Sequence, residues 1–150
     1  MTDLLSHIIM RTGLALSINS SAPTPGNVLI LKDNDGADPD QFWSLLFWRP
    51  NAHILYNPHR NLYAAPRSLD SGAPVVLFEL PPSLQFPDAH AWEIISGAPF
   101  VIRSAADDDL NLRAAGESWS PGTPMIVFKW EGGRPNEVWD ISLREFGKSA

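Results

Sequence analysis

Side chains that could bind a ligand are most concentrated in the last third of the sequence. Two indole rings there are accompanied by amide, carboxylate, ammonium and guanidinium groups. An exposed ring can cover an apolar face of a ligand while polar groups exchange hydrogen bonds with its polar edge, although both rings could equally cover the rim of a folded core. The candidate residues are Trp119, Lys129, Trp130, Arg134, Asn136 and Glu137.

Two further groups of candidate residues lie earlier in the chain. The first is an acidic, amide-bearing segment that could bind hydroxyl groups, and a solvated turn explains its composition about as well. The second pairs a phenylalanine with a histidine across a connection that prolines should stiffen. The residues are Asp33, Asn34, Asp35, Asp40 and Gln41 in the first group and Phe78 and His90 in the second.

Catalysis and metal binding find little support. The chain has no cysteine, and its four histidines are scattered at spacings that do not suit one metal site. The segment 33–38 resembles a calcium loop in its oxygen-rich composition but lacks the glutamate at the twelfth position. The adjacent Asp107, Asp108 and Asp109 are more typical of a hydrated hairpin tip than of an acid and base pair. We therefore expect a protein that is not an enzyme and needs no metal or cofactor.

The net charge of the chain disfavours some classes of binding partner. Eleven Lys and Arg residues against seventeen Asp and Glu residues give a net charge of −6 at pH 7, which disfavours binding to nucleic acid or to anionic membranes. The apolar runs are too short to span a bilayer, and the first residues have neither the basic flank nor the long apolar centre of a signal peptide. With no cysteine for disulfides, we expect a cytoplasmic protein.

The elements that must position these residues occur three times along the chain. Each copy contains a four-residue apolar run, at 28–31, 75–78 and 125–128, followed by a polar hairpin and a tryptophan. Trp43, Trp92 and Trp139 are 49 and 47 positions apart. A period near fifty that fills the chain indicates three copies of one unit, which we place at about 7–48, 51–97 and 99–144 within a single domain.

Each copy predicts four short strands, because apolar residues come in short runs and proline interrupts most windows long enough for a helix. Units this small can bury their apolar faces by closing around a threefold axis, which leaves no open sheet edge. The predicted fold is an all-β β-trefoil whose three tryptophans lie in the core and donate their N–H groups to backbone carbonyls. The predicted strands are 8–10, 14–18, 28–31, 42–47, 52–56, 62–65, 75–78, 91–95, 100–103, 110–114, 125–128 and 138–143.

A motif in the first copy resembles one of a known family. Gln41-Phe42-Trp43 matches the Gln-x-Trp motif, and the unit around it is similar to the repeats of fungal ricin B-like lectins. The other copies keep the tryptophan, but His90 and Glu137 replace the glutamine. The resemblance implies a protein that binds glycans or glycoproteins in shallow pockets, one per repeat at most, through a stacking ring and polar side chains.

The same resemblance implies a defence role against organisms that feed on the producer, and a homodimer would strengthen binding to multivalent surfaces. Many sites of this family have a carboxylate in the second strand of the repeat. Ala15, Tyr63 and Asn111 stand near these positions. Glycan binding here would therefore depend on the hairpin residues named above, or on fewer than three sites.

A second function stays open on the sequence. β-Trefoils of this length without disulfides also resemble the fungal mycocypins and their relatives that inhibit serine proteases. Such an inhibitor presents a rigid loop to the cleft of a protease, and proline reduces the entropy lost on docking. Three proline-containing loops fit this description, at 20–27, 57–61 and 80–82, and Arg60 in the second could enter a trypsin-like pocket.

Overall fold

The computed structural model describes residues 4–97 and 99–145, and the fold is the all-β β-trefoil that the repeats predict. Met1, Thr2 and Asp3, on which the expectation about a signal peptide partly rests, lie outside the described residues. Two short 3-10 turns, η1 (Pro39–Gln41) and η2 (Asp88–His90), precede the last strands of the first two repeats. The strands are β1 (Leu4–Ile9), β2 (Leu14–Ser17), β3 (Ile30–Asp33), β4 (Phe42–Arg49), β5 (Ala52–Asn57), β6 (Leu62–Pro66), β7 (Val75–Glu79), β8 (Trp92–Ile95), β9 (Val101–Ser104), β10 (Leu110–Ala114), β11 (Met125–Lys129) and β12 (Asp140–Glu145).

The first and last strands of each repeat form a closed barrel. β1 pairs with β12 and β4, β4 pairs with β5, β5 with β8, and β8 with β9. The ring closes between Phe100 and Trp139, which exchange backbone hydrogen bonds of 2.8 and 2.9 Å. Closure pairs the strand edges that an open sheet would leave exposed.

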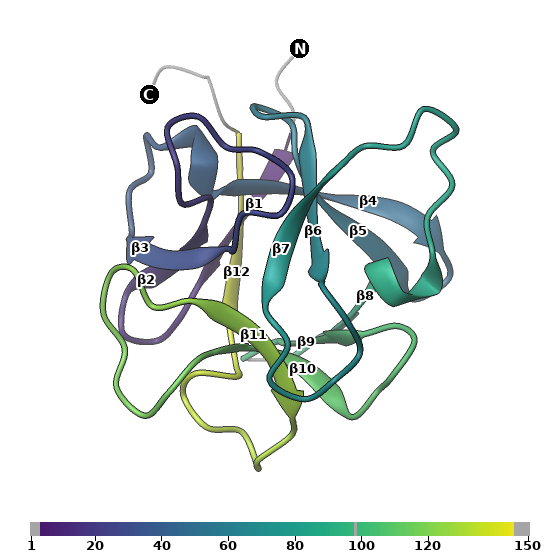
Figure 1. Cartoon of the computed structure of the whole chain (residues 1–150). Coiled ribbons are helices and arrows are strands. Elements are labelled where there is room, and N and C mark those ends of the chain that lie inside the picture. Colours follow the sequence, from purple (N-terminus) through teal and green to yellow (C-terminus); the bar gives the residue numbers. More distant parts are fainter. Residues whose placement is uncertain (1–3, 98, 146–150) are drawn as a thin grey trace.

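The remaining strands form three hairpins, β2–β3, β6–β7 and β10–β11, which meet one another across the threefold axis (Figure 1). The turn glycine of each hairpin donates its N–H to a carbonyl of the next hairpin, and all three bonds measure 2.7 Å. These glycines have φ between +96° and +98°, which other residues rarely adopt. The predicted turns therefore have a common geometric role. The pairs are Gly26 with Leu77, Gly72 with Val127, and Gly122 with Leu31.

The three repeated tryptophans are fully buried in one core cluster. Their indole N–H groups donate to backbone carbonyls on the second strand of the same repeat. Because both the burial and the hydrogen bonding repeat in each unit, the prediction for these residues is confirmed. The bonds join Trp43 to Leu16 at 3.2 Å, Trp92 to Ala64 at 2.8 Å, and Trp139 to Leu112 at 3.2 Å.

Five predicted strands start at other residues than the observed ones. β8 and β9 start one residue later than predicted, and β12 starts two residues later, at Asp140. β1 begins at Leu4 rather than at position 8, because it pairs with β12 along its whole length. β3 begins at Ile30 rather than at Val28, since Val28 bridges to Val76 in the neighbouring hairpin. The differences at β1 and β3 come from pairing with distant segments.

Candidate functional site

A pocket of about 380 Å³ opens on the third repeat. Its walls come from β8, β9, the turn between β9 and β10, β10 itself, and the residue that follows β11. Apolar and aromatic side chains therefore meet polar and charged ones in one hollow. The apolar and aromatic lining residues are Ile95, Val101 and Trp130, and the polar ones are Arg103, Asp108, Asp109 and Asn111.

Strand register brings Trp130 and Asp109 together. Leu110 at the start of β10 lies opposite Lys129 at the end of β11, so the residues just outside this pair must meet. The backbone N–H of Trp130 donates to the Asp109 carbonyl at 3.3 Å. Gly133 packs against the indole, because a Cβ on this glycine would lie 3.5 Å from the ring carbon Cζ2. The side chain is thus held in place while 42% of Trp130 stays exposed.

The two carboxylates of the pocket are free of internal partners. Asp108 and Asp109 are exposed, and within residues 4–97 and 99–145 neither side chain forms a hydrogen bond or an ion pair. The backbone N–H of Asp109 donates to Oδ1 of Asp107 at 3.1 Å, which fixes the turn. Arg103 differs, because its Nη2 lies 2.8 Å from Oε1 of Glu93. The guanidinium is neutralised locally, whereas the carboxylates are not.

These groups suit a ligand that has an apolar face and several hydroxyl groups. The Trp130 indole can lie against C–H groups, and the carboxylates of Asp108 and Asp109 can accept hydrogen bonds from hydroxyls. Asn111 stabilises the turn before β10. Its side chain is almost fully buried, and its Nδ2 donates to the Asp109 carbonyl at 3.4 Å. The pocket combines a stacking surface with exposed acceptors.

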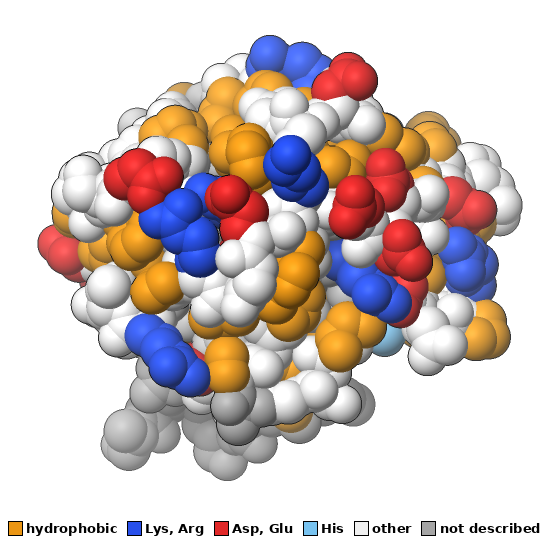
Figure 2. All heavy atoms as spheres, turned by 90° about the horizontal axis from the view of Figure 1, so that it is seen from below, with side chains coloured by type: hydrophobic (Ala, Val, Ile, Leu, Met, Phe, Trp, Pro, Cys, Tyr) orange, Lys and Arg blue, Asp and Glu red, His pale blue; other side chains and the backbone are white. Residues whose placement is uncertain are grey.

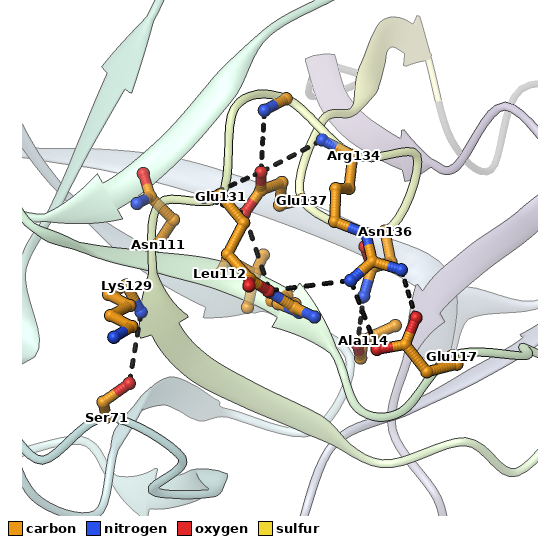
Figure 3. Close-up of polar contacts among 12 residues, drawn as sticks. Ser71, Asn111, Leu112, Ala114, Glu117, Lys129, Glu131, Arg134, Asn136 and Glu137 are labelled. Atoms are coloured by element: carbon orange, nitrogen blue, oxygen red, sulfur yellow. Dashed lines mark hydrogen bonds and ion pairs between the residues drawn. The ribbon is translucent and has the colours of Figure 1, made fainter.

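Asn136 and Glu137, both predicted as site residues, are fully buried in the hairpin between β11 and β12. Both oxygens of the Glu137 carboxylate accept from the backbone N–H of Glu131, each at 3.2 Å. Oε2 also accepts from the backbone N–H groups of Gly133 and Arg134, at 2.8 and 3.0 Å (Figure 3). The Nδ2 of Asn136 donates to a β10 carbonyl at 2.8 Å. Both side chains therefore hold the hairpin in shape and do not line the pocket.

Gln41 likewise stabilises the backbone of a hairpin, in the first repeat. Its Oε1 accepts from the backbone N–H of Asp35 at 2.9 Å, and its Nε2 donates to the Asp33 carbonyl at 2.8 Å. Gln41 and Glu137 each reach an N–H six residues earlier in the chain. The motif position two residues before the tryptophan thus locks a hairpin, while the side chains of Asp33, Asn34 and Asp35 are exposed and outside the pocket.

Asp40 is tied to the residue on which the inhibitor alternative depends. Its carboxylate accepts two hydrogen bonds from Arg60, of 2.8 and 3.1 Å. Nη1 of Arg60 also donates to the Ser21 carbonyl at 3.2 Å. The hydrogen bond to Asp40 raises the pKa of the Arg60 guanidinium above its ordinary value. The guanidinium is bonded within the molecule and does not project from the loop as a free contact for a protease.

The other predicted residues of the third repeat lie outside the pocket lining. Arg134 forms a double ion pair with Glu117, whose hydrogen bond raises the pKa of the guanidinium and lowers that of the carboxyl. The backbone N–H of Lys129 donates to Oγ of Ser71 at 3.2 Å (Figure 3). Trp119 is half-buried against the core, and its N–H donates to a carbonyl three residues earlier at 3.2 Å. Of the predicted cluster, only Trp130 lines the pocket.

In the second repeat, Phe78 and His90 belong to a small aromatic cluster. The rings of Phe78 and His90 are 4.3 Å apart, and Tyr63 stacks on Phe78 at 5.5 Å. The Tyr63 hydroxyl lies 2.7 Å from Nδ1 of His90, and Phe86 packs edge-on against Tyr63 at 5.1 Å. The rings contact one another, and none of them lines the pocket on the third repeat.

Burial of His90 predicts a pH-dependent stability. Burial lowers the pKa of this imidazole below its ordinary value of 6.5, so the unfolded chain takes up the proton first as the pH falls. The free energy of unfolding should therefore decrease as the pH drops below about 6.5. We expect His90→Gln, which copies the residue of the first repeat, to lose less stability between pH 7 and pH 5.5 than the original chain in urea unfolding. Equal losses would contradict the assignment.

Sequence reasoning missed Arg103, Asp108, Asp109 and Asn111 as pocket residues. The sequence predicts that Asp107, Asp108 and Asp109 form a hydrated hairpin tip, and Asp108 and Asp109 are indeed exposed. A usable signal was present, because Asp109 directly precedes the strand paired with the run that ends before Trp130. Aligning the two strands would have placed them side by side.

Within residues 4–97 and 99–145, no three His, Asp or Glu side chains are grouped so that they could hold a metal ion. In the same part of the chain, no helix has the length and apolar character needed to cross a membrane.

Comparison with known proteins finds similarity in structure alone. No protein-family model matches the sequence, and no curated protein sequence matches it. ThreeFoil, a designed threefold-symmetric protein, is similar with a TM-score of 0.79 and 18% identity, over 92% of this chain and 96% of its own. The Rhizoctonia solani agglutinin is similar with a TM-score of 0.77 and 18% identity, over 94% of both chains. The Macrolepiota procera ricin B-like lectin, solved with lactose, has a TM-score of 0.70 and 20% identity, over 93% of this chain and 94% of its own.

At these identities the likeness is one of fold. The chain is a β-trefoil whose structural neighbours include ricin B-like lectins.

Proposed function

We propose that this protein binds carbohydrate, and that the pocket on the third repeat is its glycan site. The observation that carries the proposal is the exposed Trp130 indole beside the unpartnered carboxylates of Asp108 and Asp109. Fold-level support comes from neighbours that are an agglutinin and a lectin in complex with lactose. The partner would be a glycan or a glycoprotein.

The chemistry of the pocket matches that of a sugar. A pyranose has a C–H face that packs on an indole, and its hydroxyls donate to carboxylates while the ring excludes water from one side. Ile95 and Val101 extend the apolar surface beside the indole. Few polar contacts and one stacking ring suit modest affinity for one sugar unit.

The three repeats present different residues at the same register position. The positions of Asp109 and Trp130 are taken by Gly13 and Asn34 in the first repeat, where the same backbone hydrogen bond of 3.3 Å recurs, and by Asn61 and Leu80 in the second. Neither offers a free ring beside a free carboxylate. We therefore propose one glycan site per chain, so that crosslinking of glycans would require the homodimer that the sequence analysis leaves as a prediction.

Trp130→Ala tests the site. Loss of the stacking surface should weaken binding to any glycan found on an array by about tenfold or more, a difference of roughly 1.4 kcal/mol. Trp119→Ala is the matched control, because this indole lies outside the pocket lining, and it should leave glycan binding unchanged. Binding that survives Trp130→Ala would refute the site, and a protein that binds no glycan would refute the function.

The cytoplasmic location, the fungal kinship and the defence role stay predictions from the sequence.

A further inference from the structure

We infer that the pocket on the third repeat selects its sugar by charge. A sugar unit with a free amino group should bind more tightly than its uncharged counterpart, and a sugar unit with a carboxylate should bind most weakly. This inference rests on the proposed function, because it specifies the chemical class of ligand for the same site.

The charges around the pocket are unbalanced. Asp108 and Asp109 contribute two negative charges that no cation in residues 4–97 and 99–145 offsets. Arg103 is the only cation among the lining residues, and its Nη2 lies 2.8 Å from Oε1 of Glu93. Counting these four groups, the pocket and its rim carry a net charge of −2.

Nearby cations are engaged elsewhere. Arg113 forms an ion pair with Glu131 and lies over the Phe128 ring, 4.5 Å from its centroid. Arg134 pairs with Glu117. Figure 2, the face seen from below in Figure 1, shows acidic and basic side chains standing next to one another around hydrophobic ones. Such pairing leaves little free positive charge to attract an anionic sugar.

Lys129 is the neighbour of Trp130 in the chain, and its backbone N–H donates to Oγ of Ser71 in another hairpin at 3.2 Å. Its side chain is exposed, and Figure 3 draws it away from the ion pair of Arg134 with Glu117. It is also absent from the pocket lining. Among residues 4–97 and 99–145, Lys129 forms no ion pair with Asp108 or Asp109.

An ammonium group on a sugar stacked against Trp130 would make two favourable interactions in this pocket. It meets carboxylates at short range in a water-exposed site, where each charge pair contributes modestly and two pairs act together. It also lies near an indole, which attracts cations through its ring face. We expect galactosamine or glucosamine to bind about tenfold more tightly than the matching hexose at low salt. The preference should shrink as salt is added.

The experiment compares two matched sets of sugars: galactose, galactosamine and galacturonic acid, and glucose, glucosamine and glucuronic acid. Each set keeps the configuration of the ring. The amino sugar has an amine in place of the hydroxyl on C2, and the acid has a carboxylate in place of the hydroxymethyl group at C6. Affinities are measured on the full chain by NMR titration, following the Trp130 indole resonance, which Trp130→Phe identifies. The expected order in the set that binds is amine, then neutral, then acid.

The double variant Asp108→Asn with Asp109→Asn removes the charges and keeps the shapes and the acceptor oxygens. It should bring the affinity ratio of amine to neutral sugar close to one, whatever it does to the affinity for the neutral sugar. The matched control, Asp33→Asn with Asp35→Asn, changes the net charge equally on exposed residues outside the pocket. That control should keep the ratio.

The outcomes separate the two proposals. Neutral sugars that bind at Trp130 as tightly as their amines, or acidic sugars that bind more tightly, would overturn the charge inference and leave the glycan site standing. A ratio that falls equally in both double variants would also overturn it, because the effect would then be one of overall charge. No shift of the Trp130 resonance with any of these sugars would refute the glycan site proposed at this pocket.

Discussion

Glu137→Ala is expected to lower the free energy of unfolding by about 3 kcal/mol. The carboxylate is fully buried and accepts hydrogen bonds from the N–H groups of Glu131, Gly133 and Arg134. Alanine would leave these donors without their acceptor in a tight hairpin, and Arg113, which lies 4.0 Å from the same carboxylate, would lose a counter-charge. Urea unfolding at neutral pH measures the loss. A change below about 1 kcal/mol would show that water replaces the carboxylate without cost.

Glu137→Gln is the control for that result. A glutamine at this position would copy Gln41, whose Oε1 accepts from the equivalent N–H in the first repeat at 2.9 Å. It retains an acceptor for the hairpin but removes the negative charge. We expect Glu137→Gln to cost less than half as much as Glu137→Ala. Equal costs would mean that the charge facing Arg113, and not the acceptor, stabilises the hairpin.

Trp92→Ala is expected to have the largest effect on stability, about 3–5 kcal/mol. The side chain is fully buried in the main core cluster, and its N–H donates to the Ala64 carbonyl at 2.8 Å. The substitution would open a cavity in the barrel and orphan that carbonyl. Because the whole free energy of unfolding of a domain is only about 5–15 kcal/mol, we expect a large drop in the urea midpoint or an unfolded chain.

Two variants bracket the Trp92 result. Trp92→Phe keeps most of the ring volume but removes the N–H, so its cost should fall well below that of alanine. Trp130→Ala removes the same side chain at a position that is 42% exposed, and it should cost less than about 1 kcal/mol. If Trp130→Ala destabilised the fold as strongly as Trp92→Ala, its effect on glycan binding could not be assigned to stacking.

The fold could be predicted almost completely from the chain. Burial of an apolar run and the need for a glycine in a turn with positive φ are local demands, and they recur at Gly26, Gly72 and Gly122. The core tryptophans follow from the same period. The starts of β1 and β3 could not be predicted, because they depend on which distant strand each segment meets.

The candidate site was predicted less well, for a physical reason. Residue type shows that a side chain can make a contact, but not toward which partner it turns. Glu137 and Gln41 have the right chemistry for a ligand and use it on their own hairpin backbones. Asp108 and Asp109 look like ordinary turn residues, and only the pairing of β10 with β11 sets them beside Trp130.

By itself, then, the sequence determined the threefold β-trefoil and the buried tryptophans, because hydrophobic period and turn chemistry act over a few residues at a time. It also named Trp130 as a candidate, and this residue lines the pocket. Only the tertiary structure decided which polar groups are consumed within the protein and which stay free to meet a ligand. That division depends on strand register and hairpin closure between segments tens of residues apart, where a shift of one position would turn each side chain to the other face.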